Sequence, residues 1–418
     1  TTGYYNTAVG TFSLDALTTG AVNVALGQVS LSSLTTGLRN TATGYGSLQM
    51  QTTACNNTAS GYRAARCTTT GGNNSIFGNQ ALLLNTTGAN NVAIGHNALY
   101  CNTTADHNTA VGVCALFANS TGARNTAVGS FSLDANTTGA CNTAVGYNSL
   151  TNNTTGHKNE GLGNYVLASN TTGANNTASG YGAMYSNTTA HCNTAFGSCA
   201  LFANTTGNHN TAVGTKSMKA VTTGESNAAI GTFSGYSVTT GCSNAAVGRS
   251  ALQSTTSGCY NVAVGKSALL YNTTASRNTA VGGCSLQANT TGTDLVGVGF
   301  KSLVANTCGK LNTASGAYTM LSNTTGGCNT AYGYGSLHDN TTGGNNVAVG
   351  ACAAFNNTTA INNVAVGVKA LFQNTTGTQN TASGYRALYV NTTGGLNTAT
   401  GSMTLYSNTT GTENVAFG

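Results

Sequence analysis

Residues 142–162 read NTAVGYNSLTNNTTGHKNEGL, and the 17-residue unit inside them, Gly146 to Leu162, decides the fold. The glycine that opens this unit recurs every 17 residues from Gly10 to Gly418, without insertion or deletion, which makes 24 complete units. We number the repeat positions 0 to 16 from this glycine. The common pattern is G-x-x-[SA]-L-x-x-N-T-T-G-x-x-N-T-A-V. A strict period of this kind is typical of a solenoid, in which each unit meets its neighbours through one repeated contact.

The composition of the repeat indicates strands and turns. A period of 17 is too short for helical-pair repeats, which need more than about 30 residues. Ala, Val and Leu occur in short runs between Gly, Asn and Thr, and the chain contains no Pro, which cannot donate to a strand ladder. We therefore predict an all-β fold: a parallel β-solenoid or β-roll of about 24 coils, fibrous, with residues 1–418 as one continuous domain.

Each coil is predicted to hold two short strands. Positions 13 to 16, with the next 0 and 1, predict the first strand, as in Asn142 to Tyr147, and positions 3 to 6 predict a shorter one around Ser149 to Thr151. Asn-Thr-Thr-Gly at positions 7 to 10 predicts a turn with glycine at positive φ. Ala at position 15 and Gly at position 0 indicate a thin interior that Leu at position 4 fills. The variable position 16 alternates to the other face, where another chain can contact it.

Charge is sparse. The chain has 14 basic and 8 acidic residues in 418, a formal charge of +6. It contains no basic run of the kind that binds nucleic acid and no stretch near the roughly 18 apolar residues of a membrane span. We therefore expect neither a nucleic-acid partner nor membrane insertion. Stacking explains the low charge, because a repeated charge would lie about 4.8 Å from its own copy in the next coil.

The two ends of the sequence lie inside the repeat. Thr1 is at position 8, and Gly418 is the first residue of a new unit. Neither end carries the polar capping unit that a free solenoid normally needs. We expect either that the chain is a segment of a longer protein or that its ends meet other copies. At about 4.8 Å per coil, its coils predict a rod of the order of 115 Å.

The core Asn-Thr-Ala-Val-Gly resembles the head repeats of trimeric autotransporter adhesins and is similar to repeats in phage tail-fibre proteins. Residues 108–112 and 363–367 carry the likeness best. The resemblance runs along the whole chain but rests on this one short motif. It implies a left-handed parallel β-roll, a homotrimer, and a place on a cell or virion surface. The 17-residue period is longer and more regular than that of adhesin repeats, and 13 Cys is high for that family.

Position 7 carries candidate N-glycosylation sites, because Asn is followed there by Thr-Thr in most units and forms the Asn-x-Ser/Thr acceptor sequence. We expect this turn to be an exposed corner to which covalent glycans, including O-glycans on the Thr pairs, can attach. The alternative is a structural Asn in a turn, since position 13 is also nearly always Asn without forming an acceptor sequence. The candidates are Asn85, Asn102, Asn136, Asn170, Asn187, Asn204, Asn272, Asn289, Asn323, Asn340, Asn374, Asn391 and Asn408.

The 13 cysteines cluster by repeat position. Cys242 and Cys259 share position 11 in successive coils, so their Cα atoms should lie about 4.8 Å apart, within disulfide range. They are the candidate disulfide. The alternative, slightly favoured, is that Cys substitutes for Ser or Ala at tolerant sites. Because 13 is odd, at least one Cys is free or pairs between chains.

Other chemistry finds little support in the sequence. His191 and Cys192 with Cys199 form no repeated metal-ligand pattern, and the scattered His suggest no catalytic triad or paired carboxylates. We expect no cofactor, no metal and no enzyme activity. Tyr recurs at position 1, where stacked rings could bind sugars; the preferred interpretation is a surface ladder that stiffens the rod. These tyrosines are Tyr45, Tyr62, Tyr147, Tyr181, Tyr334 and Tyr385.

These patterns favour a structural protein that self-associates into an extracellular fibre or filament shaft, with glycans as an optional coat. The alternative is an adhesin head or tail-fibre segment that binds host-surface receptors. A third hypothesis, an ice-binding solenoid, is weaker, because the Thr pair is consecutive and lies in a turn. The unbroken repeat length favours the shaft, since a receptor-binding head is expected to interrupt it.

Overall fold

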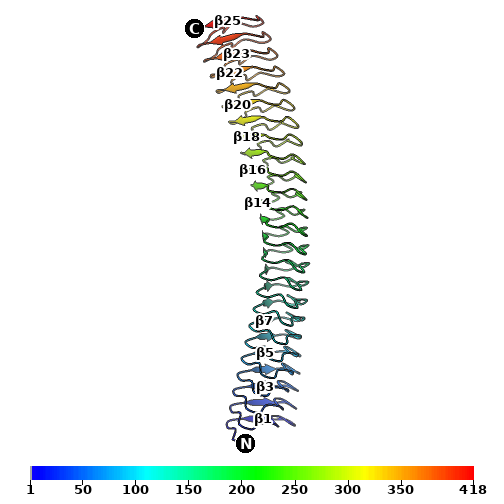
Figure 1. Ribbon diagram of the computed structural model, residues 1–418. Helices are drawn as coiled ribbons and strands as arrows, with labels where there is room; N and C mark the ends of the chain where they lie inside the picture. The colour runs from blue at the N-terminus through cyan, green and yellow to red at the C-terminus, as the bar shows by residue number, and fades with distance from the viewer. Residues whose placement is uncertain (1) are drawn as a thin grey trace. The chain divides into compact units, whose positions relative to one another are not determined.

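The structure, a computed structural model, describes residues 2–418 and shows a parallel β-solenoid of about 24 turns. These residues contain no helix, and each 17-residue coil contributes one three-residue strand. The chain divides into two compact units, Thr1–His209 and Asn210–Gly418. Each unit is a stack of such coils (Figure 1). The predicted all-β solenoid is confirmed, while one unbroken domain across the two units stays a prediction.

Twelve strands belong to the first unit. They are β1 (Thr7–Val9), β2 (Val24–Leu26), β3 (Thr41–Thr43), β4 (Thr58–Ser60), β5 (Ser75–Phe77), β6 (Val92–Ile94), β7 (Thr109–Val111), β8 (Thr126–Val128), β9 (Thr143–Val145), β10 (Glu160–Leu162), β11 (Thr177–Ser179) and β12 (Thr194–Phe196).

Thirteen strands belong to the second unit. They are β13 (Thr211–Val213), β14 (Ala228–Ile230), β15 (Ala245–Val247), β16 (Val262–Val264), β17 (Thr279–Val281), β18 (Val296–Val298), β19 (Thr313–Ser315), β20 (Thr330–Tyr332), β21 (Val347–Val349), β22 (Val364–Val366), β23 (Thr381–Ser383), β24 (Thr398–Thr400) and β25 (Val415–Phe417).

Strand pairing follows the repeat without a shift in register. In the first unit β8 pairs with β9 in parallel, and Ala127 lies opposite Ala144. In the second unit β21 pairs with β22 in the same way, with Ala348 opposite Ala365. Equivalent residues of successive coils therefore lie one above the other, as the sequence predicts.

The interior of each coil is narrow. The middle strand residue, such as Ala144, is fully buried, and Leu150 at position 4 fills the space opposite it. The flanking strand residues point outward, so Val145 at position 16 is 37% exposed. This alternation is the period-2 pattern of a strand with one face inside. Small residues at position 15 thus keep the two walls of the coil close together.

The predicted second strand is wrong, because positions 1 to 6 form a turn. Leu150 has φ of 54° and Asn148 has φ of 53°, both in the left-handed region. The turn is nevertheless bonded to both neighbouring coils: the Asn148 N–H donates to the Ser130 carbonyl, and the Leu150 N–H donates to the Val166 carbonyl. Alternate left-handed residues aim successive N–H groups at the coils on either side. These bonds offset the backbone strain of about 1 kcal/mol or more per residue.

The glycine with positive φ is the one at position 0, where Gly146 has φ of 131°. The predicted positive φ of glycine at position 10 is wrong. Gly139, at position 10, lies close to the next coil: an added Cβ would approach the Gly156 carbonyl and Asn136 Oδ1, and the other coils carry nothing larger than Ala here, as at Ala105. Position 10 therefore demands a small residue because two coils approach each other closely there.

A pair of adjacent glycines tests the role of position 0. Gly282 has φ of 131°, and a Cβ there would lie 2.5 Å from the Gly299 carbonyl oxygen, whereas a Cβ on Gly283 would meet only Phe300, at 3.4 Å. We expect Gly282→Ala to lower the free energy of unfolding by about 1–3 kcal/mol. The control Gly283→Ala should change it by less than about 0.5 kcal/mol. Urea unfolding followed by circular dichroism measures both, and equal effects would contradict this assignment.

Asparagine at position 13 forms a buried ladder along the inside of the coils. The Asn142 backbone N–H donates to Asn125 Oδ1 at 2.9 Å, and Asn142 Nδ2 donates to the Gly156 carbonyl at 2.9 Å. Its own Oδ1 accepts from the Asn159 N–H, also at 2.9 Å. Each side chain therefore satisfies two buried backbone groups of the following coil, neither of which can reach water.

Removing one rung of this ladder should be costly. Asn91 is buried; it bonds Ala105 through Nδ2, and its Oδ1 accepts from the Asn108 N–H. Asn91→Ala leaves both buried partners short of a bond, so we expect the free energy of unfolding to fall by about 3 kcal/mol. Asn79→Ala, at an exposed site in the same coil, is the control and should be nearly neutral. Equal stability of the two variants in denaturant unfolding would show that the ladder is dispensable.

Candidate functional site

The candidate glycosylation sites do not form an exposed corner, so that expectation is wrong. Twelve of the thirteen asparagines have no exposed surface, and Asn408 in the last coil is half-buried. Asn136 is typical: its Nδ2 donates to Asn119 Oδ1 at 2.8 Å and to the Gly139 carbonyl at 3.0 Å. This nitrogen is the atom to which a glycan would be attached. In the folded coil both of its hydrogens are already committed inside the protein.

The position-7 asparagines therefore form a second amide ladder, which is interrupted in coils that carry another residue at this position. It runs from Asn85 to Asn204 in the first unit and from Asn272 to Asn408 in the second. The Asn side chains bond their counterparts in adjacent coils and the position-10 carbonyl of their own coil. The sequence left open that these asparagines are structural residues of a turn. Their burial and hydrogen bonds support that interpretation.

Threonines beside this ladder differ in exposure. At position 8 the Thr137 hydroxyl donates to the Thr154 carbonyl of the next coil, at 3.1 Å. At position 9 the side chains, such as Thr138 and Thr155, are exposed. Hydroxyls available to an O-linked sugar thus lie at position 9. O-glycosylation stays a prediction that these exposed residues permit.

Cys242 and Cys259 lie in neighbouring coils, as predicted, and both are free thiols. The Cys242 N–H donates to Cys259 Sγ at 3.1 Å. The hydrogen bond with Cys259, followed by burial, raises the pKa of the Cys242 thiol to about 11. Because the thiolate is the reactive form, Cys242 is a weak nucleophile at neutral pH. The disulfide stays a prediction, and the raised pKa keeps the Cys242 thiol itself protonated at neutral pH.

Oxidation of the chain tests this pair. With a diffusible disulfide as oxidant, we expect a Cys242–Cys259 linkage to form slowly at neutral pH and faster as the pH approaches 11, because more thiolate is then present. Peptide mass mapping without reduction measures the linkage. Cys308→Ser removes an exposed thiol elsewhere and should leave it unchanged. A rate that does not rise with pH would contradict thiolate control.

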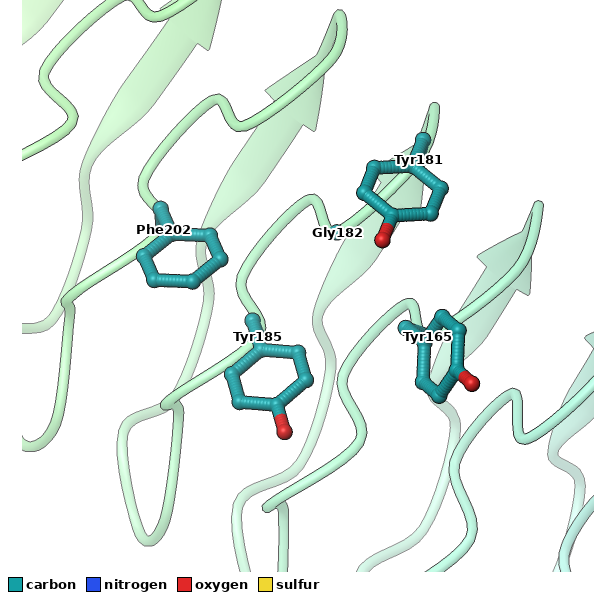
Figure 2. A pocket seen from close by; sticks show the side chains of 5 residues that line it. All are labelled: Tyr165, Tyr181, Gly182, Tyr185 and Phe202. Atoms are coloured by element: carbon teal, nitrogen blue, oxygen red, sulfur yellow. The ribbon is translucent and has the colours of Figure 1, made fainter.

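The surface of the first unit contains a hollow of about 390 Å³, lined by four aromatic side chains and one glycine. Figure 2 shows their arrangement: the rings of Tyr185 and Phe202, from successive coils, lie side by side, while Tyr181 and Tyr165 bound the other side. Gly182 lies between these two groups. We call this set, Tyr165, Tyr181, Gly182, Tyr185 and Phe202, the aromatic hollow.

Stacking between coils sets the geometry of the aromatic hollow. Tyr185 and Phe202 share position 5, and their ring centroids lie 5.2 Å apart with planes at 8°. Tyr165 and Tyr181 meet edge to face, at 5.9 Å and 75°. Most coils carry a larger residue at position 2. Gly182 has no side chain, and this missing side chain opens the space. Burial and then the neighbouring phenols of Tyr147 and Tyr181 raise the pKa of Tyr165, so this phenol remains a neutral hydrogen-bonding group.

Elsewhere, charged groups are few. Arg277 Nε and Asp294 Oδ1 are 2.6 Å apart, and the hydrogen bond with Arg277 lowers the pKa of Asp294 to about 2. Residues 2–418 contain no cluster of three or more His, Cys, Asp or Glu side chains placed to hold a metal ion. In the same residues there is no helix long and apolar enough to span a membrane.

Comparison with protein-family models gives no match, and comparison with curated proteins gives none either. The likeness to adhesin and tail-fibre repeats therefore rests on the short motif alone.

Sequence reasoning identified Tyr181 as a member of a tyrosine series but missed the hollow. Four of its residues lie at repeat positions 2 and 5, which vary from coil to coil. The signal that could have found it is the run Tyr165, Gly182, Cys199 at position 2 of three successive coils. A glycine between two larger residues in one column marks a missing side chain on the surface.

Proposed function

We propose that the chain is a structural protein that forms the shaft of an extracellular fibre by self-association. The observation that carries this proposal is the uniform contact between coils: the same strand pairing recurs along each unit, and the same amide ladder accompanies it in nearly every coil. Such a stack gains length by adding copies of one coil, without a new contact having to evolve. A role that depends on regular extension rather than on catalysis fits this design.

The outer strand face is the surface that we assign to self-association. Its position-16 side chains are mostly apolar, and Ile94 and Val128 are 40% and 36% exposed. Across positions 14 and 16 of the strands the only charged residue is Glu160. An uncharged, regularly spaced apolar face is the kind of surface that protein interfaces cover. A homotrimer, which the resemblance implies, would bury this face at its centre.

Charges placed on this face test the proposal. The double variant Ile94→Lys with Val128→Lys should convert an oligomer into a monomer in sedimentation velocity, because lysine ammonium groups would be desolvated in the interface. Fibrous particles seen by negative-stain microscopy should be lost with it. The matched control, Thr87→Lys with Thr121→Lys, places the same charges on exposed threonines of the same coils and should keep the assembly. A monomeric natural chain, or an oligomer that both variants retain, would refute assembly through this face.

A second candidate function, recognition of a receptor, is favoured by one observation, the aromatic hollow. It departs from the uniform surface that a passive shaft requires. The two functions are compatible, because the hollow uses repeat positions 1, 2 and 5 and the strand face uses positions 14 and 16.

A further inference from the structure

The set of residues that lines the aromatic hollow occurs twice, once in each unit. Its residues recur 153 residues later in the sequence, nine repeats on, as Tyr318, Tyr334, Gly335, His338 and Phe355. Four of the five residues are identical in type, and His338 takes the place of Tyr185. We call this set the second hollow.

The ring geometry of the two hollows also agrees. Tyr318 and Tyr334 meet edge to face at 5.8 Å and 73°, against 5.9 Å and 75° for Tyr165 and Tyr181. The rings of His338 and Phe355 are stacked at 4.4 Å with planes at 6°. Gly335 has φ of 60° and Gly182 has φ of 62°. The rings and the glycine of the second hollow therefore repeat the arrangement of the first, except that His338 Nδ1 also contacts Asp339 Oδ1 at 2.7 Å.

This recurrence is not a consequence of the 17-residue period. Glycine occupies position 2 in one other coil, at Gly46, where the neighbours of an added Cβ are Gln49, Arg63 and Val29 instead of aromatic rings. At positions 11 and 12 of the same coils the two stretches differ, as in His191-Cys192 against Gly344-Asn345. The likeness is therefore concentrated at the residues that build the hollow.

We propose that each hollow binds one ring of a neutral saccharide. Flat aromatic faces cover the apolar C–H face of a pyranose, and the phenol hydroxyls around the rim can bond its hydroxyl groups. The lining of the first hollow has no charged side chain, and its 390 Å³ lies within the size range of small-ligand sites. Tyrosine supplies both an apolar body and a polar tip.

The backbone that forms the floor of each hollow is held by hydrogen bonds between coils in the absence of a ligand. The Gly182 N–H donates to the Asn164 carbonyl and the Gly335 N–H donates to the Ala317 carbonyl, both at 3.1 Å. Rings held on bonded coils lose little freedom on binding. A quaternary ammonium ligand is the alternative that an aromatic site raises. It is disfavoured because the nearly parallel rings of Tyr185 and Phe202 do not enclose one point, as an aromatic cage for a cation does.

The test uses the full chain with cellotetraose, mannotetraose, galactobiose and tetraacetylchitotetraose as probes, and phosphocholine as the competing class. Saturation-transfer difference NMR detects binding and calorimetry counts sites. We expect at least one saccharide to bind, with two sites per chain. No saccharide binding at about 10 mM, or stronger binding of phosphocholine, would overturn the proposal.

Filling the hollows locates the sites. Phenylalanine occurs naturally at position 2, as Phe131 and Phe233 with φ of 58°, so Gly182→Phe and Gly335→Phe suit the backbone. Each variant should remove one of the two sites, and the double variant should remove both. Gly46→Phe is the matched control and should keep two sites. Saccharide binding that persists in the double variant would place it elsewhere and refute the assignment, whether or not the chain assembles into a fibre.

Discussion

The carbonyl at position 10 is the point on which the architecture depends, because both asparagine ladders meet there. The Gly139 carbonyl accepts from Asn136 Nδ2 of its own coil and from Asn125 Nδ2 of the preceding coil. A buried carbonyl and buried side-chain amides satisfy one another, so a coil can close tightly without water. The requirement for a small residue at this position follows, since a larger side chain would separate the coils and break both bonds.

Most of the fold follows from the sequence. The period predicts parallel stacking in register, and alternation of Thr, Ala and Val predicts which strand residues face inward. The second half of the coil was mispredicted because Leu and Asn at positions 4 and 2 look like strand or turn residues, whereas Leu150 and Asn148 adopt left-handed conformations. Bonds to the neighbouring coils override the local preference there, and no single-coil pattern reveals such bonds.

The same limit explains the asparagines and the hollow. An Asn-Thr-Thr-Gly segment reads as a surface turn, yet Asn136 is buried, because the turn folds over the interior and its amide completes a ladder. The aromatic hollow needs residues from three coils, and its defining residue, Gly182, has no side chain. A consensus sequence hides single-coil differences such as Gly182, although these differences distinguish one coil from the next.

Tolerance within the ladder shows which departures matter. Leu295 replaces Asn at position 13, and its N–H still donates to Asn278 Oδ1 at 3.0 Å, so the stack absorbs the loss of one amide rung. The register of the coils therefore continues past a missing rung, although the bonds of that rung are lost. The position-2 run of Tyr, Gly and Cys gives no such structural benefit: it leaves a surface void and exposes Tyr181 and Tyr334, each 58% exposed. Stability does not account for the repetition of this run, whereas the ligand that we propose does.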